Sequence, residues 1–391
     1  MQGEAGFDSA APQDLADDPA KPQESYRRMR EAGAVARGEG FVTVATRETI
    51  DHVLRQSDIF SSNMDAIDLG NVRPLIPLQI DPPDHLKYRK LLDPLFAPRE
   101  VAKLETDIAA LVNELIDTFA DRGEVEFCEA FAIPLPSKVF LRLLGLPYED
   151  LDQFLYMKDG IIRPQGETFG AAAEYRRVAA QAIYDYFDVA LDEREKRRTD
   201  DLLSQFLDAE ADGERLSREE ILDIGFLFLI AGLDTVTDTL ECDYAFLAQN
   251  PAHRQQIVDD PSIIPSAVEE MLRWETPVPG VARVAVQDTQ LDGCPIAKGD
   301  AVGVIIGSAN TDETEFPDAY TVDFRRSPNR HIAFGGGVHR CLGSHLARLE
   351  LRVALREWHR RIPQYSVKPG FELEYSGGLR SLAALPLVWD A

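Results

Sequence analysis

A glycine-rich stretch near the C-terminal end, residues 334–343 (FGGGVHRCLG), constrains the fold more than any other part of the chain. Three consecutive glycines disfavour a helix or a packed strand, and they let the backbone approach another group closely because they carry no Cβ. Helical spacing begins directly after Cys341, in LGSHLARL. We therefore predict that Cys341 lies on a tight turn leading into a helix, where backbone N–H groups and the helix dipole favour a thiolate.

A thiolate at a helix start is most usefully a nucleophile or a metal ligand. A nucleophile needs a base and an oxyanion hole, whereas a ligand of haem iron needs glycines for a flat approach and an aromatic residue beside the sulfur. The spacing F-x-x-G-x-x-x-C-x-G fits the second function, through Phe334, Gly337, Cys341 and Gly343. A buried structural cysteine beside a glycine-rich turn is the simpler alternative.

A second unusual segment is the helix predicted over residues 221–249, which follows a capping box at residues 217–220. Its centre is apolar on all sides, so the helix should run through the core. Asp234 and Thr235 nevertheless lie in that centre, next to Gly232. A buried carboxylate is costly unless it is paired or functional. Either Asp234 is bonded to a nearby side chain at a local kink, or both polar residues face a space beside the helix.

These segments occur in the order found in one known family. The 334–343 loop resembles the haem-binding loop of the cytochrome P450 family, and the segment AGLDT resembles its oxygen-activation motif. The E-x-x-R pattern of Glu270 and Arg273 resembles its core ion pair. The whole set looks most like soluble bacterial members of the camphor-hydroxylase type. The resemblance implies a mainly α fold with a small β region, a triangular helical prism, and non-covalent haem b.

The resemblance also implies roles for individual residues. Cys341 would be the proximal iron ligand, while Asp234 and Thr235 would serve proton delivery and oxygen activation. The remaining expected haem contacts are Phe334, Gly335 and Gly343 in the loop and His85, Arg89, Arg283 and His339 toward the propionates. Glu270, Arg273 and Arg326 would form a structural ion-pair triad. The expected pocket is lined by residues 60–80 and by Leu229, Ile230, Leu233, Val278, Val281 and Leu382.

Composition restricts the classes of partner and compartment. The chain carries 67 acidic against 41 basic residues, a net charge of −26, which argues against nucleic-acid binding. No apolar run reaches the length of a membrane span, and the N-terminus lacks the pattern of a signal peptide. The four cysteines have neither zinc-like nor CxxC spacing, which suits a reducing cytoplasm. We therefore expect a cytoplasmic protein.

Basic residues concentrate around the cysteine segment. Residues 324–362 contain nine arginines but only two acids, Glu350 and Glu357. Ordinary solvation of a helix would explain some of them. The alternative is a docking surface for an acidic electron donor on the cysteine side of the iron, carried by Lys87, Lys90, Arg348 and Arg352. The implied partners are a ferredoxin and an NAD(P)H-dependent ferredoxin reductase, because the chain contains no flavin or nicotinamide motif.

The predicted domain is single and spans residues 1–391, since no linker, repeat or low-complexity segment interrupts the middle, and residues 1–20 should be poorly ordered. Periodicity predicts helices over residues 22–37, 46–54, 100–120, 133–144, 151–160, 167–198 and 221–249. It predicts strands over residues 40–44 and 292–306, extended chain over 278–283, and an irregular stretch from 309 to the cysteine.

The predicted activity is hydroxylation of a small-to-medium hydrophobic substrate with O2 and two external electrons. Terpenoid, steroid, fatty-acid-derived and aromatic compounds all fit an apolar pocket without a charged anchor. A peroxide-driven haem-thiolate enzyme is one alternative, although it would have no need for the Asp234–Thr235 pair. A non-catalytic haem-binding sensor is the other.

Overall fold

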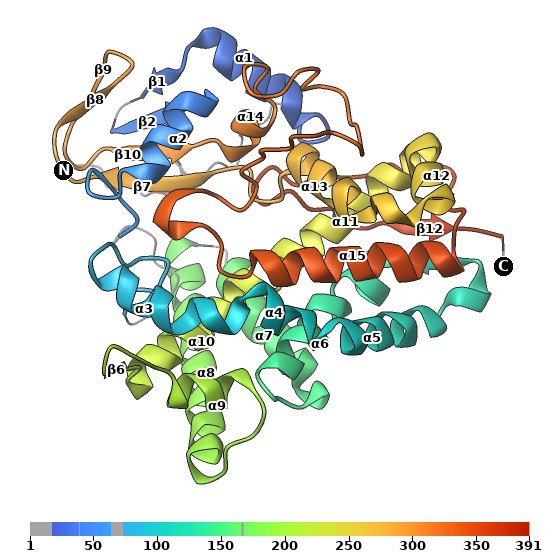
Figure 1. The fold of residues 1–391 in the computed structure, drawn as a ribbon, viewed down its shortest axis with the longest axis horizontal. Helices are drawn as coiled ribbons and strands as arrows, with labels where there is room; N and C mark the ends of the chain where they lie inside the picture. The colour runs from blue at the N-terminus through green and yellow to red at the C-terminus, as the bar shows by residue number, and fades with distance from the viewer. Residues whose placement is uncertain (1–17, 39, 64–72, 166–167, 391) are drawn as a thin grey trace. The chain divides into compact units, whose positions relative to one another are not determined.

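The computed structural model describes residues 18–38, 40–63, 73–165 and 168–390, and its internal contacts divide the chain into two units. Unit 1 comprises residues 1–61, 103–133 and 235–391, and unit 2 comprises residues 62–102 and 134–234. Figure 1 shows the elements of both. Each unit is assembled from stretches that alternate along the chain. The prediction of a single domain stays a prediction.

Unit 1 contains all the larger sheets among the described residues. Its helices are α1 (Pro22–Ala32), α2 (Arg47–Arg55), α5 (Glu105–Asp117), α11 (Asp234–Gln249, whose first residue is assigned to unit 2), α12 (Pro251–Asp259), α13 (Ile264–Glu275), α14 (Ile306–Asn310) and α15 (Ser344–Arg361). Its strands are β1 (Val35–Arg37), β2 (Phe41–Val44), β3 (Phe60–Ser61), β4 (Glu124–Glu126), β7 (Val281–Ala285), β8 (Thr289–Leu291), β9 (Cys294–Ile296), β10 (Ala301–Val304), β11 (Ser366–Val367) and β12 (Pro386–Val388).

A five-stranded sheet organises one part of unit 1, in the order β1-β2-β10-β7-β3. Strands β2 and β10 run parallel, with Val42 opposite Val302, while β10 and β7 run antiparallel. The alternate residues Val42, Val44, Val302 and Val304 are fully buried, as the period of two in a half-buried strand requires. This places Arg283, in the middle of β7, at a fixed position in the sheet.

Helix α15 forms the centre of the other part of unit 1. It packs against α5, and Figure 1 shows the two helices side by side. Trp358 of α15 is fully buried and contacts the rings of Phe119, Phe127, Phe131 and Tyr244. Aromatic rings of this size bury a large apolar area, so this cluster holds the helix that follows Cys341 in place.

Unit 2 is built mainly of helices. They are α3 (Asp84–Leu92), α4 (Pro98–Ala102), α6 (Pro134–Leu143), α7 (Leu151–Ile162), α8 (Phe169–Lys196), α9 (Leu202–Asp208) and α10 (Arg218–Gly232), with the short strands β5 (Glu210–Ala211) and β6 (Glu214–Arg215). The predicted capping box is present, because the Ser217 and Glu220 side chains bond each other's backbone N–H groups. Helices α7 and α10 both pack against α8.

The prediction of a mainly helical fold with small sheets is confirmed, but several boundaries were wrong. Helix α1 ends at Ala32, because Gly33 adopts a φ of 145°, and residues 35–37 pair with β2. The helix predicted over residues 100–120 divides into α4 and α5. Residues 306–310, predicted partly as strand, form the short helix α14. The disorder predicted for residues 1–20 falls mostly on residues outside the described part.

The long helix predicted over residues 221–249 is interrupted. Helix α10 ends at Gly232 and α11 begins at Asp234, so the break falls at Leu233, inside the AGLDT segment. Glycine weakens a helix by about 1 kcal/mol relative to alanine, which is consistent with a break at this point. In the described segments of the chain, no helix is both long enough and apolar enough to cross a membrane.

Candidate functional site

The loop of residues 334–343, here called the cysteine loop, leads directly into α15. Gly335 and Gly337 adopt φ values of +69° and +64°, which side chains with a Cβ rarely tolerate. The backbone N–H of Cys341 donates to the carbonyl oxygen of Phe334 at 2.9 Å and closes the loop. Cys341 itself is exposed, three residues before α15 begins. The predicted tight turn at a helix start is therefore present.

The glycines of this loop have two different surroundings. A Cβ added at Gly337 would lie 2.0 Å from the carbonyl oxygen of Leu54, at the end of α2, so this glycine allows two backbones to touch. A Cβ added at Gly335 or Gly343 would meet no heavy atom of the described chain within 4 Å. Open space beside these two glycines, together with an exposed thiol, fits the approach of a flat group such as haem.

Positive charge gathers at the start of α15. Burial, and then the charges of Arg340, Arg348 and Arg352, lower the pKa of His345, which lies four residues after Cys341. The same field would favour a thiolate over a thiol at Cys341, and it adds to the effect of the helix N-terminus.

Asp234 is buried and paired. Its side chain is 4% exposed, and its Oδ1 atom accepts a hydrogen bond of 2.5 Å from Lys158 Nζ of α7, while Arg163 Nη2 lies 3.7 Å from Oδ2. The alternative in which Asp234 is bonded to a nearby side chain at a kink is therefore what its geometry shows. Sequence reasoning missed Lys158 altogether, although a lysine inside the apolar pattern of residues 151–162 was a visible signal.

The other residues of the AGLDT segment differ in their solvent exposure. Ala231 and Gly232 are exposed, although most of their neighbours in α10 are buried. Thr235 is half-buried, and its carbonyl oxygen accepts a hydrogen bond of 2.6 Å from Thr239 Oγ1. Ala231 and Gly232 are thus accessible, while Asp234 is buried, and the expectation that Asp234 and Thr235 face a space beside the helix stays a prediction.

The predicted propionate contacts are divided between the units. His85 and Arg89 lie on α3 of unit 2, where burial and then the charge of Arg89 lower the pKa of His85. Arg89 also pairs with Asp93 at 2.7 Å. In unit 1, Arg283 is 8% exposed and donates to the Ala282 carbonyl at 2.7 Å, and His339 ends the 3-10 turn Gly337–His339.

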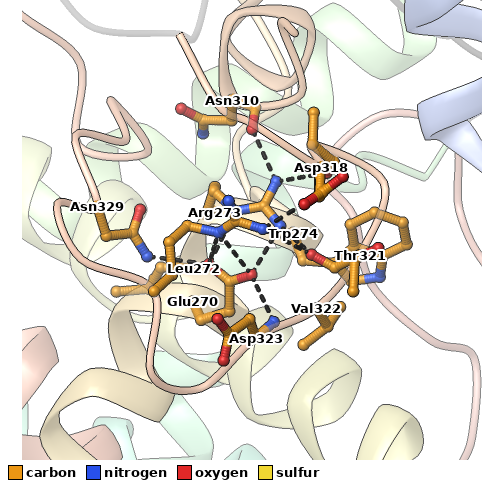
Figure 2. Close-up of polar contacts among 12 residues, drawn as sticks. Glu270, Leu272, Arg273, Trp274, Asn310, Asp318, Thr321, Val322, Asp323 and Asn329 are labelled. Atoms are coloured by element: carbon orange, nitrogen blue, oxygen red, sulfur yellow. Dashed lines mark hydrogen bonds and ion pairs between the residues drawn. The ribbon is translucent and has the colours of Figure 1, made fainter.

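The structure brings the predicted ion-pair triad together. Glu270 and Arg273 of α13 are fully buried and joined by two hydrogen bonds of 2.9 and 2.8 Å. Arg326 lies 3.1 Å from both carboxylate oxygens. Figure 2 shows that Arg273 also reaches backbone carbonyls, which include those of Asn310 and Thr321. The triad therefore ties α13 to the chain that leads to the cysteine loop.

The predicted pocket residues differ in accessibility. Leu229, Leu233 and Leu382 are buried, and Ile230, Val278 and Val281 are half-buried. Of the predicted pocket loop 60–80, residues 64–72 lie outside the described part. Arg73 of this loop is hydrogen-bonded to Asp223 of α10 at 2.7 Å.

The residues predicted to form a docking surface are largely occupied within the chain. In unit 2, Lys87 pairs with Glu220 at 2.9 Å and Lys90 pairs with Asp212 at 2.6 Å. In unit 1, Arg348 pairs with Glu269 at 2.7 Å, and Arg352 donates to the carbonyl of Arg348 at 2.9 Å. Each of the four side chains thus has a partner within its own unit, and their role as a docking surface stays a prediction.

Comparisons with known proteins agree on one family. The family model described as cytochrome P450 matches residues 147–261 and 262–361. A steroid C26-monooxygenase of Mycobacterium tuberculosis is 35% identical over 92% of each chain. A mycinamicin IV hydroxylase/epoxidase of Micromonospora griseorubida is 37% identical over 80% of this chain and 79% of its own. The crystal structure of CYP109E1 from Bacillus megaterium with testosterone has a TM-score of 0.86 at 31% identity and covers 95% of this chain and 99% of its own.

Proposed function

Because the chain belongs to the cytochrome P450 family of haem b monooxygenases, we propose that it hydroxylates a hydrophobic small molecule with electrons from an external ferredoxin. The balanced reaction converts one C–H bond, O2, two electrons and two protons into an alcohol and water. When bound, the haem supplies the cleavage of the O–O bond, which a cysteine thiolate ligand favours. The protein contributes binding, orientation and protons.

The single observation that supports Cys341 as the iron ligand is that its surroundings differ from those of the other three cysteines. Burial raises the pKa of the Cys128 and Cys242 thiols and disfavours their thiolates. Cys294 lies next to a strand turn, away from any helix start. Cys341 is exposed on a glycine loop, in the positive field at the start of α15. His85, Arg89, Arg283 and His339 are the proposed partners of the two haem propionates, because cations and imidazole donors satisfy buried carboxylates.

Asp234 is the proposed proton carrier, and Thr235 would donate a hydrogen bond in oxygen activation once haem is present. The pairing of Asp234 with Lys158 adds a condition, because a carboxylate held at 2.5 Å by an ammonium group must leave that partner before it can pass a proton elsewhere. The Thr235→Ala variant should consume electrons without forming the matching amount of product. Equal coupling in the variant and the parent protein would remove Thr235 from this role.

Steroids are the proposed first class of substrate. The names of two similar proteins, a steroid C26-monooxygenase and a P450 crystallised with testosterone, support this choice. The half-buried apolar side chains of Ile230, Val278 and Val281 offer contacts without charge, as a steroid requires. A steroid that displaces water from the iron should convert its spectrum from low to high spin. Absence of that shift across a steroid panel would reject this class.

The decisive experiment is the spectrum of the purified protein after reduction and exposure to CO. A red-shifted Soret band would establish thiolate ligation, and the Cys341→Ser variant should lose it. The same substitution at Cys294, which is also partly accessible, should leave the band unchanged. A histidine-like CO band in the parent protein would refute the assignment.

The proposed electron donors are an acidic ferredoxin and its NAD(P)H-dependent reductase, in the cytoplasm.

A further inference from the structure

A carboxylate on α13 binds two side chains that lie close to the cysteine loop. The Oε1 and Oε2 atoms of Glu269 accept hydrogen bonds of 2.7 and 2.8 Å from the guanidinium of Arg348, in a bidentate pair. The Oε2 atom also lies 2.9 Å from Nε2 of His331. Bidentate pairing fixes both the distance and the plane of the guanidinium group. Glu269 thus orients a cation from α15 and an imidazole from the chain before the loop.

The hydrogen bonds of His331 define its tautomer. The backbone N–H of Ala333 donates to Nδ1 at 3.2 Å, so the ring proton lies on Nε2 and is donated to Glu269. Burial alone would raise the pKa of Glu269, but the bonds from His331 and Arg348 lower it to about 2. The group therefore consists of a carboxylate, a guanidinium and an imidazole ring whose Nε2 faces the carboxylate.

Arg348 reaches both ends of the segment that carries Cys341. Its guanidinium carbon lies 4.3 Å from the centroid of the Phe334 ring, within the range of a cation–π contact. Its Nη1 atom donates to the carbonyl oxygen of Ser344, at the first turn of α15, at 3.3 Å. The carbonyl of Phe334 in turn accepts the N–H of Cys341. One side chain therefore contacts the residues that flank the cysteine on both sides.

We propose that Glu269 and Arg348 form a charge pair that positions the cysteine loop and sets the reduction potential of the haem iron. Arg348 contributes a positive charge beside the ring of Phe334, and Glu269 neutralises most of that charge while holding it in place. His331 fixes the carboxylate from the other side. Nearby charge is one of the means by which a protein adjusts the potential of such a centre. The inference rests on the proposed ligation by Cys341.

The test compares the reduction potentials of five holoproteins, which are the parent, three variants of the charge pair and one control. Glu269→Gln keeps the shape of the side chain but removes its negative charge. The net field then becomes more positive, which stabilises the ferrous state relative to the ferric state. The ferrous-to-ferric ratio at a fixed applied potential should rise about threefold, equivalent to about 30 mV for one electron. Arg348→Met removes the positive charge, and the ratio should fall by a similar factor. Arg348→Lys keeps the charge and loses the bidentate geometry, so its potential should stay near the parent value.

A purely structural role predicts a different pattern. Loosening the loop would shift Glu269→Gln and Arg348→Met in the same direction, and that result would overturn the proposal, as would unchanged potentials. If Glu269→Gln does not retain haem, the Arg348 variants still decide the question, because the potential should fall in Arg348→Met and stay near the parent value in Arg348→Lys. Glu357→Gln is the matched control, because Glu357 also pairs with arginines of α15, Arg356 and Arg360, but on another turn. Its potential should be unchanged.

The CO spectrum separates this proposal from the proposed function. If the parent protein shows no thiolate-type CO band, Cys341 is not the iron ligand. The proposal for the charge pair, which rests on that ligation, then fails as well. Parent protein with that band, but with variants whose potentials do not move in opposite directions, would defeat the charge pair alone.

Discussion

At the scale of single residues, the pair of Lys158 and Asp234 is the most consequential contact that the sequence concealed. The two side chains come from helices 76 positions apart, and each is 4% exposed. A lysine in α7 could equally have reached solvent, so periodicity gave no reason to pair it with Asp234. The presence of the acid within an apolar helix was predictable, whereas the identity of its partner depends on how α7 packs near α10.

Replacing Lys158 by Met should strongly destabilise the protein. The change leaves a buried carboxylate without its nearest partner, which costs about 3–5 kcal/mol in comparable cases. Denaturant unfolding at pH 7 measures the loss. Lys196→Met, at an exposed position at the end of α8, is the control and should change stability by less than about 0.5 kcal/mol. Equal stabilities of the two variants would show that the Lys158–Asp234 bond contributes nothing.

The two glycines of the cysteine loop offer a second comparison at this scale. Gly337→Ala would place a methyl group 2.0 Å from the Leu54 carbonyl oxygen, so the loop and α2 must separate. We expect a fall in melting temperature of several degrees together with poor haem retention. Gly335→Ala has the same positive φ but open space around it, so the melting temperature of the haem-free protein should fall less. Thermal unfolding of both variants is measured without haem. A lower melting temperature for Gly335→Ala than for Gly337→Ala would contradict this expectation.

At the scale of elements, α13 and its triad test how much a buried network stabilises the fold. Arg326 has a 10% exposed side chain and bonds Glu270, whereas its neighbour Arg325 is 65% exposed and pairs with Asp260 on the surface. Arg326→Ala should lower the free energy of unfolding by roughly 3 kcal/mol, because Glu270 stays buried. Arg325→Ala should cost about 0–1 kcal/mol. Similar losses would mean that the triad is replaceable.

Element types were more predictable than element ends. The apolar spacing of residues 133–144 indicated a helix that is present as α6. Local rules failed where tertiary pairing decided the outcome, as at residues 35–37, which leave a helical pattern to pair with β2. The sequence offered a local kink near Asp234 as one alternative, but it did not predict that the helix would break at Leu233. Most boundaries depend on neighbours that are distant in sequence.

At the scale of the whole molecule, pH should act through buried groups of α15. Burial raises the pKa of Glu350 to about 8, and its Oε2 atom has no hydrogen-bond partner among the described residues. The native state then holds a proton that the unfolded state releases above about pH 4.5, so stability falls as pH rises from there to about 8. Burial lowers the pKa of His359 to about 4, so its contribution is lost as pH falls from about 6.5 to 4.

The free energy of unfolding of the Glu350→Gln variant should therefore not show the decline that the parent protein shows as the pH rises from about 4.5 to about 8. Its stability relative to the parent protein should increase from pH 5 to pH 8, by up to about 4 kcal/mol, since one pKa unit corresponds to about 1.4 kcal/mol. Unfolding measured at several pH values gives the difference directly. For the control Glu372→Gln, at an exposed position, the plot of stability against pH should run parallel to that of the parent protein. A parallel profile for Glu350→Gln would mean that this carboxyl is not protonated in the native state.

The pairing of Lys87, Lys90 and Arg348 with acids of the same unit would also affect the association rate of the proposed acidic ferredoxin. With a net charge of −26 and three of the four proposed contact cations paired with acids, the molecule repels another anion out to about 10 Å, the screening length at 0.1 M salt. Added salt shortens that length and removes the long-range repulsion first. The association rate should therefore rise with ionic strength before it falls, the reverse of ordinary steering between opposite charges. Such a maximum in stopped-flow rates would identify an enzyme that accepts its donor through short-range contacts.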